Sequence, residues 1–274
     1  MINHRDEPVI VCDLDGVLWR GETAIPGSAD AVKALRASGA RVAFLTNNSS
    51  VRMMDVVARL GAIGVFAAPD DVATSAQAAA AMLAQDLASG SRVLACAGDG
   101  VIEALTAAGF DVVANTAEVV PDVDAVVVGF HRDFDFDRLD RAADAVRRGA
   151  AFVATNTDPS YPGTDRVLPG AGSLVAAVAV ASGHAPVVAG KPEAATVALV
   201  RERFGADGIM VGDRPSTDGV LAQRLGWPFA MVLSGIGGHD PNEPVPVPAP
   251  EWVAADLAEL AALLLGSVPP GPST

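Results

Sequence analysis

Basic charge is scarce in this chain of 274 residues. It has 19 lysine and arginine residues against 33 aspartate and glutamate residues, so its formal net charge is −14. A surface this acidic argues against nucleic acid or an anionic membrane as a partner, because both carry charge of the same sign. Apolar runs are also short, and none approaches the ~20 residues of a membrane-spanning helix. We therefore expect neither nucleic-acid nor membrane binding.

Cysteine and histidine are also rare. The two cysteines, Cys12 and Cys96, each lie within an apolar run, which is typical of reduced, buried thiols and not of a disulfide framework. The four histidines lie far apart without ligand-like spacing, which argues against a zinc site. This pattern predicts a cytoplasmic protein.

Hydrophobic residues, mostly alanine and valine, make up half of the chain. Short β-type runs alternate with amphipathic helical stretches, an order that predicts βαβ units and a mostly parallel sheet. The polar stretch 156–172 has no clear structure of its own, and loops of this length are often functional. A Pro-rich excursion is expected at 241–250, and a disordered tail is expected after Gly266.

Two carboxylates follow the first predicted strand. Val9-Ile-Val-Cys-Asp13 is an apolar run, and Leu14, Asp15 and Gly16 come next. In open α/β folds the carboxyl edge of the sheet carries the site. Two clustered carboxylates repel each other unless a cation or a proton lies between them, so the pair indicates Mg²⁺ with acid–base or nucleophilic chemistry. Alone, such a pair is as consistent with a turn after a strand.

Lysine is almost absent, since only Lys33 and Lys191 occur among the 19 basic residues. A lysine is a compact point charge on a thin stem, whereas arginine is a planar fork, so Lys191 suits a crowded anionic pocket. The alternative is a surface lysine at a helix start, which Pro192 at the first helical position makes plausible.

A second apolar strand ends in Gly212-Asp213, and Asp218 follows about one turn later. Asp213 could complete a carboxylate set around Mg²⁺, which binds few carboxylates together with waters and substrate oxygens. Asp218 suits a supporting role that orients ligands or Lys191, although an acid at a helix N-terminus is an alternative.

Polar residues also follow the strand at 41–45. Thr46 and Asn47 offer hydroxyl, amide and backbone N–H donors at a strand end, where such groups can hold phosphate oxygens. A local turn or an Asn cap is the alternative interpretation of these residues.

These segments together resemble the motif set of the haloacid dehalogenase-like phosphohydrolases. They occur in the family's order, as Asp13-Leu-Asp15-Gly16, Thr46-Asn47-Asn48-Ser49, Gly190-Lys191-Pro192 and Gly212-Asp213…Thr217-Asp218. The stretches around Gly129, Asn156 and Gly170 look like the cap of the NagD-like subfamily. That subfamily includes phosphatases for p-nitrophenyl phosphate, phosphoglycolate, glycerol 3-phosphate and pyridoxal phosphate.

The resemblance implies a Rossmann-like, doubly wound parallel core at 1–74 and 187–274, with an inserted α/β cap at 75–186. It also implies a Mg²⁺-dependent phosphomonoesterase for a small-molecule phosphate ester, and a possible homodimer through the cap. In the cap, Asn156, Asp158 and Tyr161 lie in the segment expected to select the leaving group. Tyr161, the only tyrosine, offers a flat apolar face and a hydroxyl, although it could instead pack on its own cap.

The resemblance also implies roles for the core residues. Asp13 would be the nucleophile that forms an aspartyl phosphate, and Asp15 would protonate the leaving alkoxide and then activate water. Mg²⁺ would be held by Asp13, the Asp15 carbonyl oxygen and Asp213. Phosphoryl oxygens would be bound by Thr46, Asn47 and Lys191, and two further residues would support these groups from behind, namely Asn48 and Asp218.

Two other classes of function stay open. One is a phosphotransferase or a non-catalytic descendant of the same fold. The other is a nucleotide-binding module, since Gly98-Asp-Gly100 follows a predicted strand like the start of GxGxxG, although Glu103 stands where the third glycine belongs. Two departures from the family pattern, Val51 and Gly219, leave the substrate open.

Overall fold

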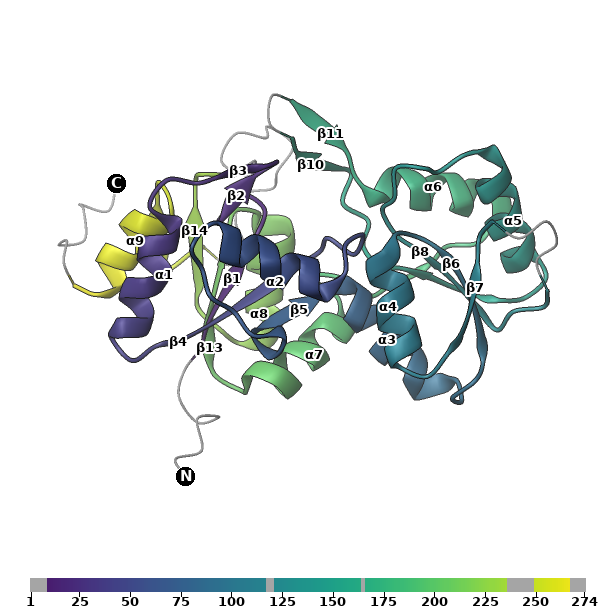
Figure 1. Ribbon diagram of the computed structural model, residues 1–274, viewed down its shortest axis with the longest axis horizontal. Helices are drawn as coiled ribbons and strands as arrows, with labels where there is room; N and C mark the ends of the chain where they lie inside the picture. Colours follow the sequence, from purple (N-terminus) through teal and green to yellow (C-terminus); the bar gives the residue numbers. More distant parts are fainter. Residues whose placement is uncertain (1–8, 117–120, 164–165, 236–248, 267–274) are drawn as a thin grey trace.

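The computed structural model describes residues 9–116, 121–163, 166–235 and 249–266. Almost all of the predicted excursion at 241–250, and the whole tail after Gly266, lie outside the described residues. Within them the chain forms two parallel sheets side by side, each with helices on both faces (Figure 1). The predicted α/β, Rossmann-like fold is confirmed.

The first sheet has six strands in the order β15-β14-β13-β1-β4-β5, and every neighbouring pair is parallel. Its central strand β1 is buried on both faces, as is typical of a parallel sheet covered by helices. The strands in chain order are β1 (Val9–Asp13), β4 (Arg41–Thr46), β5 (Val72–Thr74), β13 (Gly208–Gly212), β14 (Phe229–Val232) and β15 (Trp252–Ala254).

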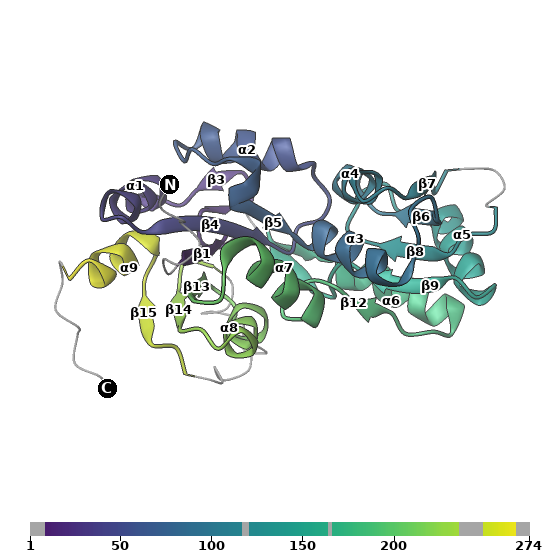
Figure 2. The same ribbon diagram turned by 90° about the horizontal axis from the view of Figure 1, so that it is seen from below.

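Side chains of β1 point alternately to two hydrophobic layers. Ile10 and Cys12 pack with α1 (Ser28–Ala37), α2 (Met53–Ala62) and α9 (Leu257–Leu264). Val9 and Val11 belong to the layer that holds α7 (Ala194–Phe204) and α8 (Val220–Leu225) on the other face (Figure 2). A period of two along the strand therefore builds the doubly wound core.

The second sheet has five parallel strands in the order β12-β9-β8-β6-β7. Helices α3 and α4 pack on one of its faces and α5 and α6 on the other. Its elements are α3 (Ser75–Asp86), β6 (Arg92–Cys96), α4 (Asp99–Ala107), β7 (Asp111–Ala114), β8 (Ala125–Val128), α5 (Phe136–Arg147), β9 (Ala151–Ala154), α6 (Ala171–Ser182) and β12 (Val187–Val188).

Two sequence-based expectations need correction, and one helix has no signal in the sequence. Strand β12 pairs with β9, so residues 187–188 lie in the second sheet although the expected boundary assigned them to the first. The stretch 156–172 is not structureless, because β10 (Ser160–Pro162) and β11 (Val167–Pro169) form an antiparallel hairpin. Helix α6 was not predicted, because its apolar residues surround the axis and show no helical period.

Candidate active site

A cleft of about 290 Å³ lies where the carboxyl ends of the two sheets meet. Residues after β1, β4 and β13 line it from the first sheet, and residues after β8 and β9 line it from the second. The lining includes all of the expected site residues except the buried Asp218: Asp13, Asp15, Thr46, Asn47, Asn48, Asn156, Asp158, Tyr161, Lys191 and Asp213.

The Lys191 ammonium group anchors the floor of the cleft. Lys191 follows β12, and its Nζ lies 2.8 Å from Asp13 Oδ1 and 2.8 Å from Asp218 Oδ1. All three side chains are buried. The choice of lysine over arginine is explained by this geometry, because a point charge fits between two carboxylates where a planar fork would not.

Negative charge exceeds positive charge in this cluster. Burial raises the pKa of Asp13 well above its ordinary value; Lys191 opposes that rise, while Asp218 and Asp213 add to it. Burial alone would lower the pKa of Lys191, but Asp13 and Asp218 outweigh it and the pKa is raised. The raised pKa of Lys191 shows that the site keeps the ammonium group charged, and the raised pKa of Asp13 shows that the site favours a further positive charge.

Three carboxylates in this cluster lie close enough to bind one ion. One oxygen from each of Asp13, Asp213 and Asp218 falls within 4.8 Å of the others, and no other such group occurs among the described residues. Asp218 already uses one oxygen on Lys191, and its other oxygen accepts from the Arg214 backbone N–H at 3.1 Å. Asp13 and Asp213 are therefore the carboxylates best suited to a hard cation.

Glycines make room around Asp213. Gly16 has a φ of 89°, and a Cβ on it would lie 2.7 Å from Asp213 Cγ. A Cβ on Gly235 would lie 1.8 Å from Asp213 Oδ2. The backbone therefore approaches this carboxylate more closely than any side chain would allow, and the residues present fit a small divalent cation.

Asp15 is held in a different setting. Its Oδ1 accepts a hydrogen bond of 3.0 Å from Trp19 Nε1, and the Arg59 guanidinium lies 4.0 Å above the Trp19 ring. Burial raises the pKa of Asp15, against the opposing effects of the Trp19 hydrogen bond and Arg59. A raised pKa favours a carboxyl group that can carry and deliver a proton.

The side chains of Thr46 and Asn47 differ in whether a hydrogen-bond donor stays free for a ligand. The Thr46 hydroxyl accepts from the Asn48 backbone N–H at 3.0 Å, so its own hydrogen can point elsewhere. The Asn47 side chain is fully engaged by the protein: Oδ1 accepts from Lys191 N at 2.8 Å, and Nδ2 donates to Asp158 Oδ2 at 3.0 Å and to Lys191 O at 3.2 Å. The amide expected to bind phosphate instead joins the two sheets. Asn48 Oδ1 accepts from the Ser50 N–H and hydroxyl.

The expected selectivity residues do face the cleft. Asn156 Nδ2 donates to the Asn47 carbonyl at 2.7 Å, which ties this segment to the first sheet. Tyr161, on β10, meets the Phe130 ring edge-on at a centroid distance of 5.2 Å, and its hydroxyl accepts from Arg132 Nη2 at 2.9 Å. Tyr161 therefore both packs on the loop after β8 and lines the cleft.

Comparisons with known proteins agree with this geometry. A family model described as haloacid dehalogenase-like hydrolase matches residues 10–111, and a second HAD hydrolase-like model matches 188–260. The D-glycerol 3-phosphate phosphatase of Mycobacterium tuberculosis is 38% identical over 259 residues, which cover 93% of this chain and 71% of that protein. The chain belongs to the haloacid dehalogenase-like hydrolases.

Other relatives place it among the NagD-like members of this family. Mouse chronophin is 37% identical over 240 residues, which cover 83% of this chain and 81% of chronophin. The crystal structure of the mycobacterial glycerol phosphate phosphatase with magnesium aligns with a TM-score of 0.80 and 37% identity over 93% of this chain and 76% of the other. NagD from E. coli K-12 aligns with a TM-score of 0.78 and 29% identity over 92% and 98% of the two chains.

Sequence reasoning missed several residues that line the cleft of this HAD-like hydrolase. Three are arginines, Arg59, Arg132 and Arg214, and another is Glu22 in the turn between β2 (Trp19–Arg20) and β3 (Thr23–Ala24). Arginine is the ordinary basic residue of this chain, so nothing in the local sequence distinguishes these three from surface arginines. Only Arg214 had a positional signal, since it follows Asp213.

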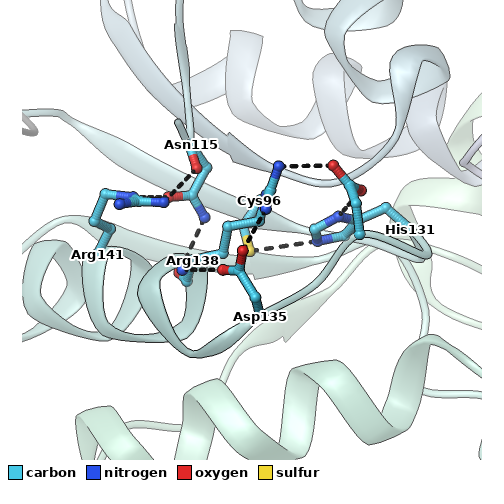
Figure 3. Close-up of polar contacts among 7 residues, drawn as sticks. Cys96, Asn115, His131, Asp135, Arg138 and Arg141 are labelled. Carbon is cyan, nitrogen blue, oxygen red and sulfur yellow. Dashed lines mark hydrogen bonds and ion pairs between the residues drawn. The ribbon is translucent and has the colours of Figure 1, made fainter. Parts of the chain in front are cut away.

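A partly buried polar network holds the loop that carries Arg132 (Figure 3). His131 Nδ1 lies 2.8 Å from Asp133 Oδ1, and its Nε2 lies 3.7 Å from Cys96 Sγ. Arg138, on α5, bridges Asp133 and Asp135 at 2.7 Å each. With His131 turned inward, its neighbours Phe130 and Arg132 face the cleft. Burial raises the pKa of Cys96 to about 11, so its thiol stays protonated at neutral pH.

The nucleotide-binding alternative does not fit the structure. A Cβ on Gly98 would lie 2.5 Å from the Ser50 carbonyl oxygen, and one on Gly100 would lie 2.2 Å from that of Val51. These glycines allow the N-terminus of α4 to pack against the loop after β4, and that contact fills the position where a phosphate loop would open.

No helix in the described part of the chain is long and apolar enough to cross a membrane.

Proposed function

We propose that this chain is a Mg²⁺-dependent phosphomonoesterase that hydrolyses small-molecule phosphate esters through an aspartyl phosphate. The observation that carries the proposal is the buried Lys191, 2.8 Å from both Asp13 and Asp218 on the floor of the cleft. Relatives named as phosphatases, with 38% and 34% identity over most of this chain, support the same activity. The modest cleft favours a small ester.

The metal would be held by Asp13, Asp213 and the Asp15 backbone carbonyl. Bound there, Mg²⁺ would neutralise charge on the phosphoryl oxygens and on the attacking carboxylate. Asp218 keeps Lys191 in place from below, because its two oxygens are committed to Lys191 and the Arg214 N–H. The magnesium complex of the mycobacterial relative supports this cofactor.

Asp13 would attack phosphorus while the bond between phosphorus and the leaving oxygen breaks. Asp15 would donate a proton to that oxygen, and would then take one from the water that cleaves the aspartyl phosphate. The Lys191 ammonium, the Thr46 hydroxyl and the Asn47 backbone N–H would bind the phosphoryl oxygens. Asn48 would support Thr46 by its N–H donation.

Phosphate release from 4-nitrophenyl phosphate tests this proposal. We expect release with Mg²⁺, none with a chelator, and none from the Asp13→Asn variant under either condition. Nitrophenol formed in excess of phosphate when glycerol is added would reveal a phosphotransferase, and an inactive wild-type protein would reveal a non-catalytic descendant.

The domain roles belong to the same proposal. We assign catalysis to the first sheet and its helices, and substrate selection to a cap that spans 75–186 and also includes β12.

A homodimer through the cap stays a prediction. Val180 on α6 is 85% exposed and Val187 on β12 is 60% exposed, and both suit such a contact. Light scattering measures the oligomeric state directly.

A cytoplasmic location belongs to the same proposal, and the buried free thiols Cys12 and Cys96 support it.

A further inference from the structure

Three guanidinium groups line the cleft in addition to the Lys191 ammonium group. Arg59 comes from α2, Arg132 from the loop after β8, and Arg214 from the segment after β13. They reach the cleft from three separate parts of the chain. Five acidic residues line the same cleft, so these three arginines and Lys191 nearly balance their charge. In a protein with a net charge of −14, this gathering of arginines at one place needs an explanation.

Their hydrogen-bond partners are neutral. Arg59 donates to the Gly21 carbonyl, Arg132 to the Tyr161 hydroxyl at 2.9 Å, and Arg214 to the Ser160 carbonyl at 3.0 Å. Within the described ranges, none of the three guanidinium groups lies within 4.0 Å of a carboxylate oxygen, whereas the Arg138 guanidinium pairs with two carboxylates. No ion pair therefore occupies these guanidinium groups in the described part of the chain, although through space Arg59 and Arg214 oppose the rise that burial causes in the pKa of Asp15, and Arg214 opposes the same rise in the pKa of Asp158.

Arg132 and Arg214 converge on one short strand. Their partners, Tyr161 and Ser160, are consecutive residues of β10. One guanidinium approaches β10 from the second sheet and the other from the first, directly beside Asp213. Two acidic groups share the cleft wall: Asp158, whose Oδ2 already accepts from Asn47, and Glu22, exposed on the β2–β3 turn.

We propose that Arg132 and Arg214 form a subsite for a second anionic group, so that the preferred substrate is a small phosphate ester whose alcohol part carries a carboxylate or a further phosphate. The inference rests on the proposed phosphatase function and names its substrate class. Guanidinium groups recognise such anions through charge-assisted, often bidentate hydrogen bonds. A cleft of about 290 Å³, near the lower end of the size range of small-molecule sites, has room for a phosphoryl group together with an anionic arm that reaches these arginines.

Two esters of similar size separate the charge from the shape of the leaving group. Phosphoglycolate has an anionic leaving group and glycerol 3-phosphate a neutral one. We expect wild-type kcat/KM to be at least about tenfold higher for phosphoglycolate. Arg132→Gln should lower that value by about tenfold and change the value for glycerol 3-phosphate by less than about threefold, and Arg132→Lys should fall between.

Arg147→Gln is the matched control, because Arg147 is a half-exposed arginine of the same domain that does not line the cleft. It removes the same charge and should leave both values unchanged. Equal preference, a preference for glycerol 3-phosphate, or an equal loss for both esters in Arg132→Gln would overturn the proposal.

Binding separates this inference from the proposed function. If the wild-type protein releases phosphate from none of the esters, including 4-nitrophenyl phosphate, the phosphatase proposal fails. Titration of phosphoglycolate and glycerol 3-phosphate into Asp13→Asn protein with Mg²⁺ then decides the subsite. A tighter Kd for phosphoglycolate that disappears in the Asp13→Asn/Arg132→Gln double variant supports it, and equal Kd values refute it.

Discussion

The two sheets share one architecture but differ in where they carry polar side chains. In the first sheet the strands themselves end in them: Asp13 closes β1, Thr46 closes β4, and Asp213 follows β13 directly. In the second sheet β6, β8 and β9 end in apolar residues or cysteine. Its polar groups at the cleft, including Arg132 and Tyr161, come several residues later.

This difference matches two different demands. Reacting atoms must be fixed to a fraction of an ångström, and a buried strand end provides that rigidity. Selection among leaving groups tolerates variation, which loops on a rigid scaffold provide. We therefore expect substitutions at the strand ends of the first sheet to lower the rate for every substrate, and substitutions at Arg132 and Tyr161 to change the order of substrates.

The largest effect is expected at the end of β1. Asp13→Asn places an amide where a nucleophilic carboxylate stands, and an amide does not attack phosphorus, so kcat should fall by at least about 10³-fold. Phosphate release measures the loss, and circular dichroism checks that the fold is retained. A clean preparation that kept its activity would contradict the assignment of the nucleophile.

Asp15→Asn should separate leaving groups by their basicity. Without a proton donor, turnover of glycerol 3-phosphate should fall by about 10²–10⁴-fold, whereas 4-nitrophenyl phosphate should suffer less because nitrophenolate leaves unprotonated. The comparison of kcat for the two esters is the measurement. Equal losses would remove the general-acid role.

Asp213→Asn should weaken the metal and leave the nucleophile intact. We expect about 10–100-fold lower activity at low Mg²⁺, with partial recovery as Mg²⁺ is raised. A titration of activity against Mg²⁺ concentration tests this expectation. An unchanged midpoint would show that Asp213 does not bind the ion.

Asn47→Ala breaks the link between the sheets. It removes the bonds to Asp158 and to the Lys191 backbone and leaves buried partners unsatisfied, so unfolding free energy should fall by about 1–3 kcal/mol and KM should rise. Asn115→Ala is the control, since Asn115 is also a buried asparagine. Its side chain donates to the Arg138 carbonyl and accepts from Arg141, so both partners lie in the cap. It should cost similar stability, measured by thermal unfolding, and spare KM.

The smallest effect is expected at Tyr161. Tyr161→Ala removes the hydroxyl that holds Arg132 and the ring that meets Phe130. The ranking of substrates by kcat/KM should change by a few fold, at about 1 kcal/mol, while 4-nitrophenyl phosphate turnover is largely spared. If the order stays the same, Tyr161 serves packing alone.

The same contrast explains what the sequence could predict. The sequence predicts that Asp13, Lys191 and Asp213 share one site, because two stand at strand ends and the third is a rare lysine, and all three line the cleft. The engagement of Asn47 with Asp158 was not found, because it joins residues 111 positions apart and depends on how the sheets meet. The sequence does not predict helix α6, because its apolar residues lie on every side of the helix and show no helical period.

The scarcity of lysine has a practical consequence for handling the protein. Lys191 is locked beneath the cleft, whereas the other lysine, Lys33, lies on α1 with 61% of its side chain exposed. Amine-reactive dyes or resins should therefore attach, apart from the amino terminus, at one known position on the far side of the first sheet from the second (Figure 1). A tether placed there would fix the protein to a sensor surface and leave the cleft open to substrate.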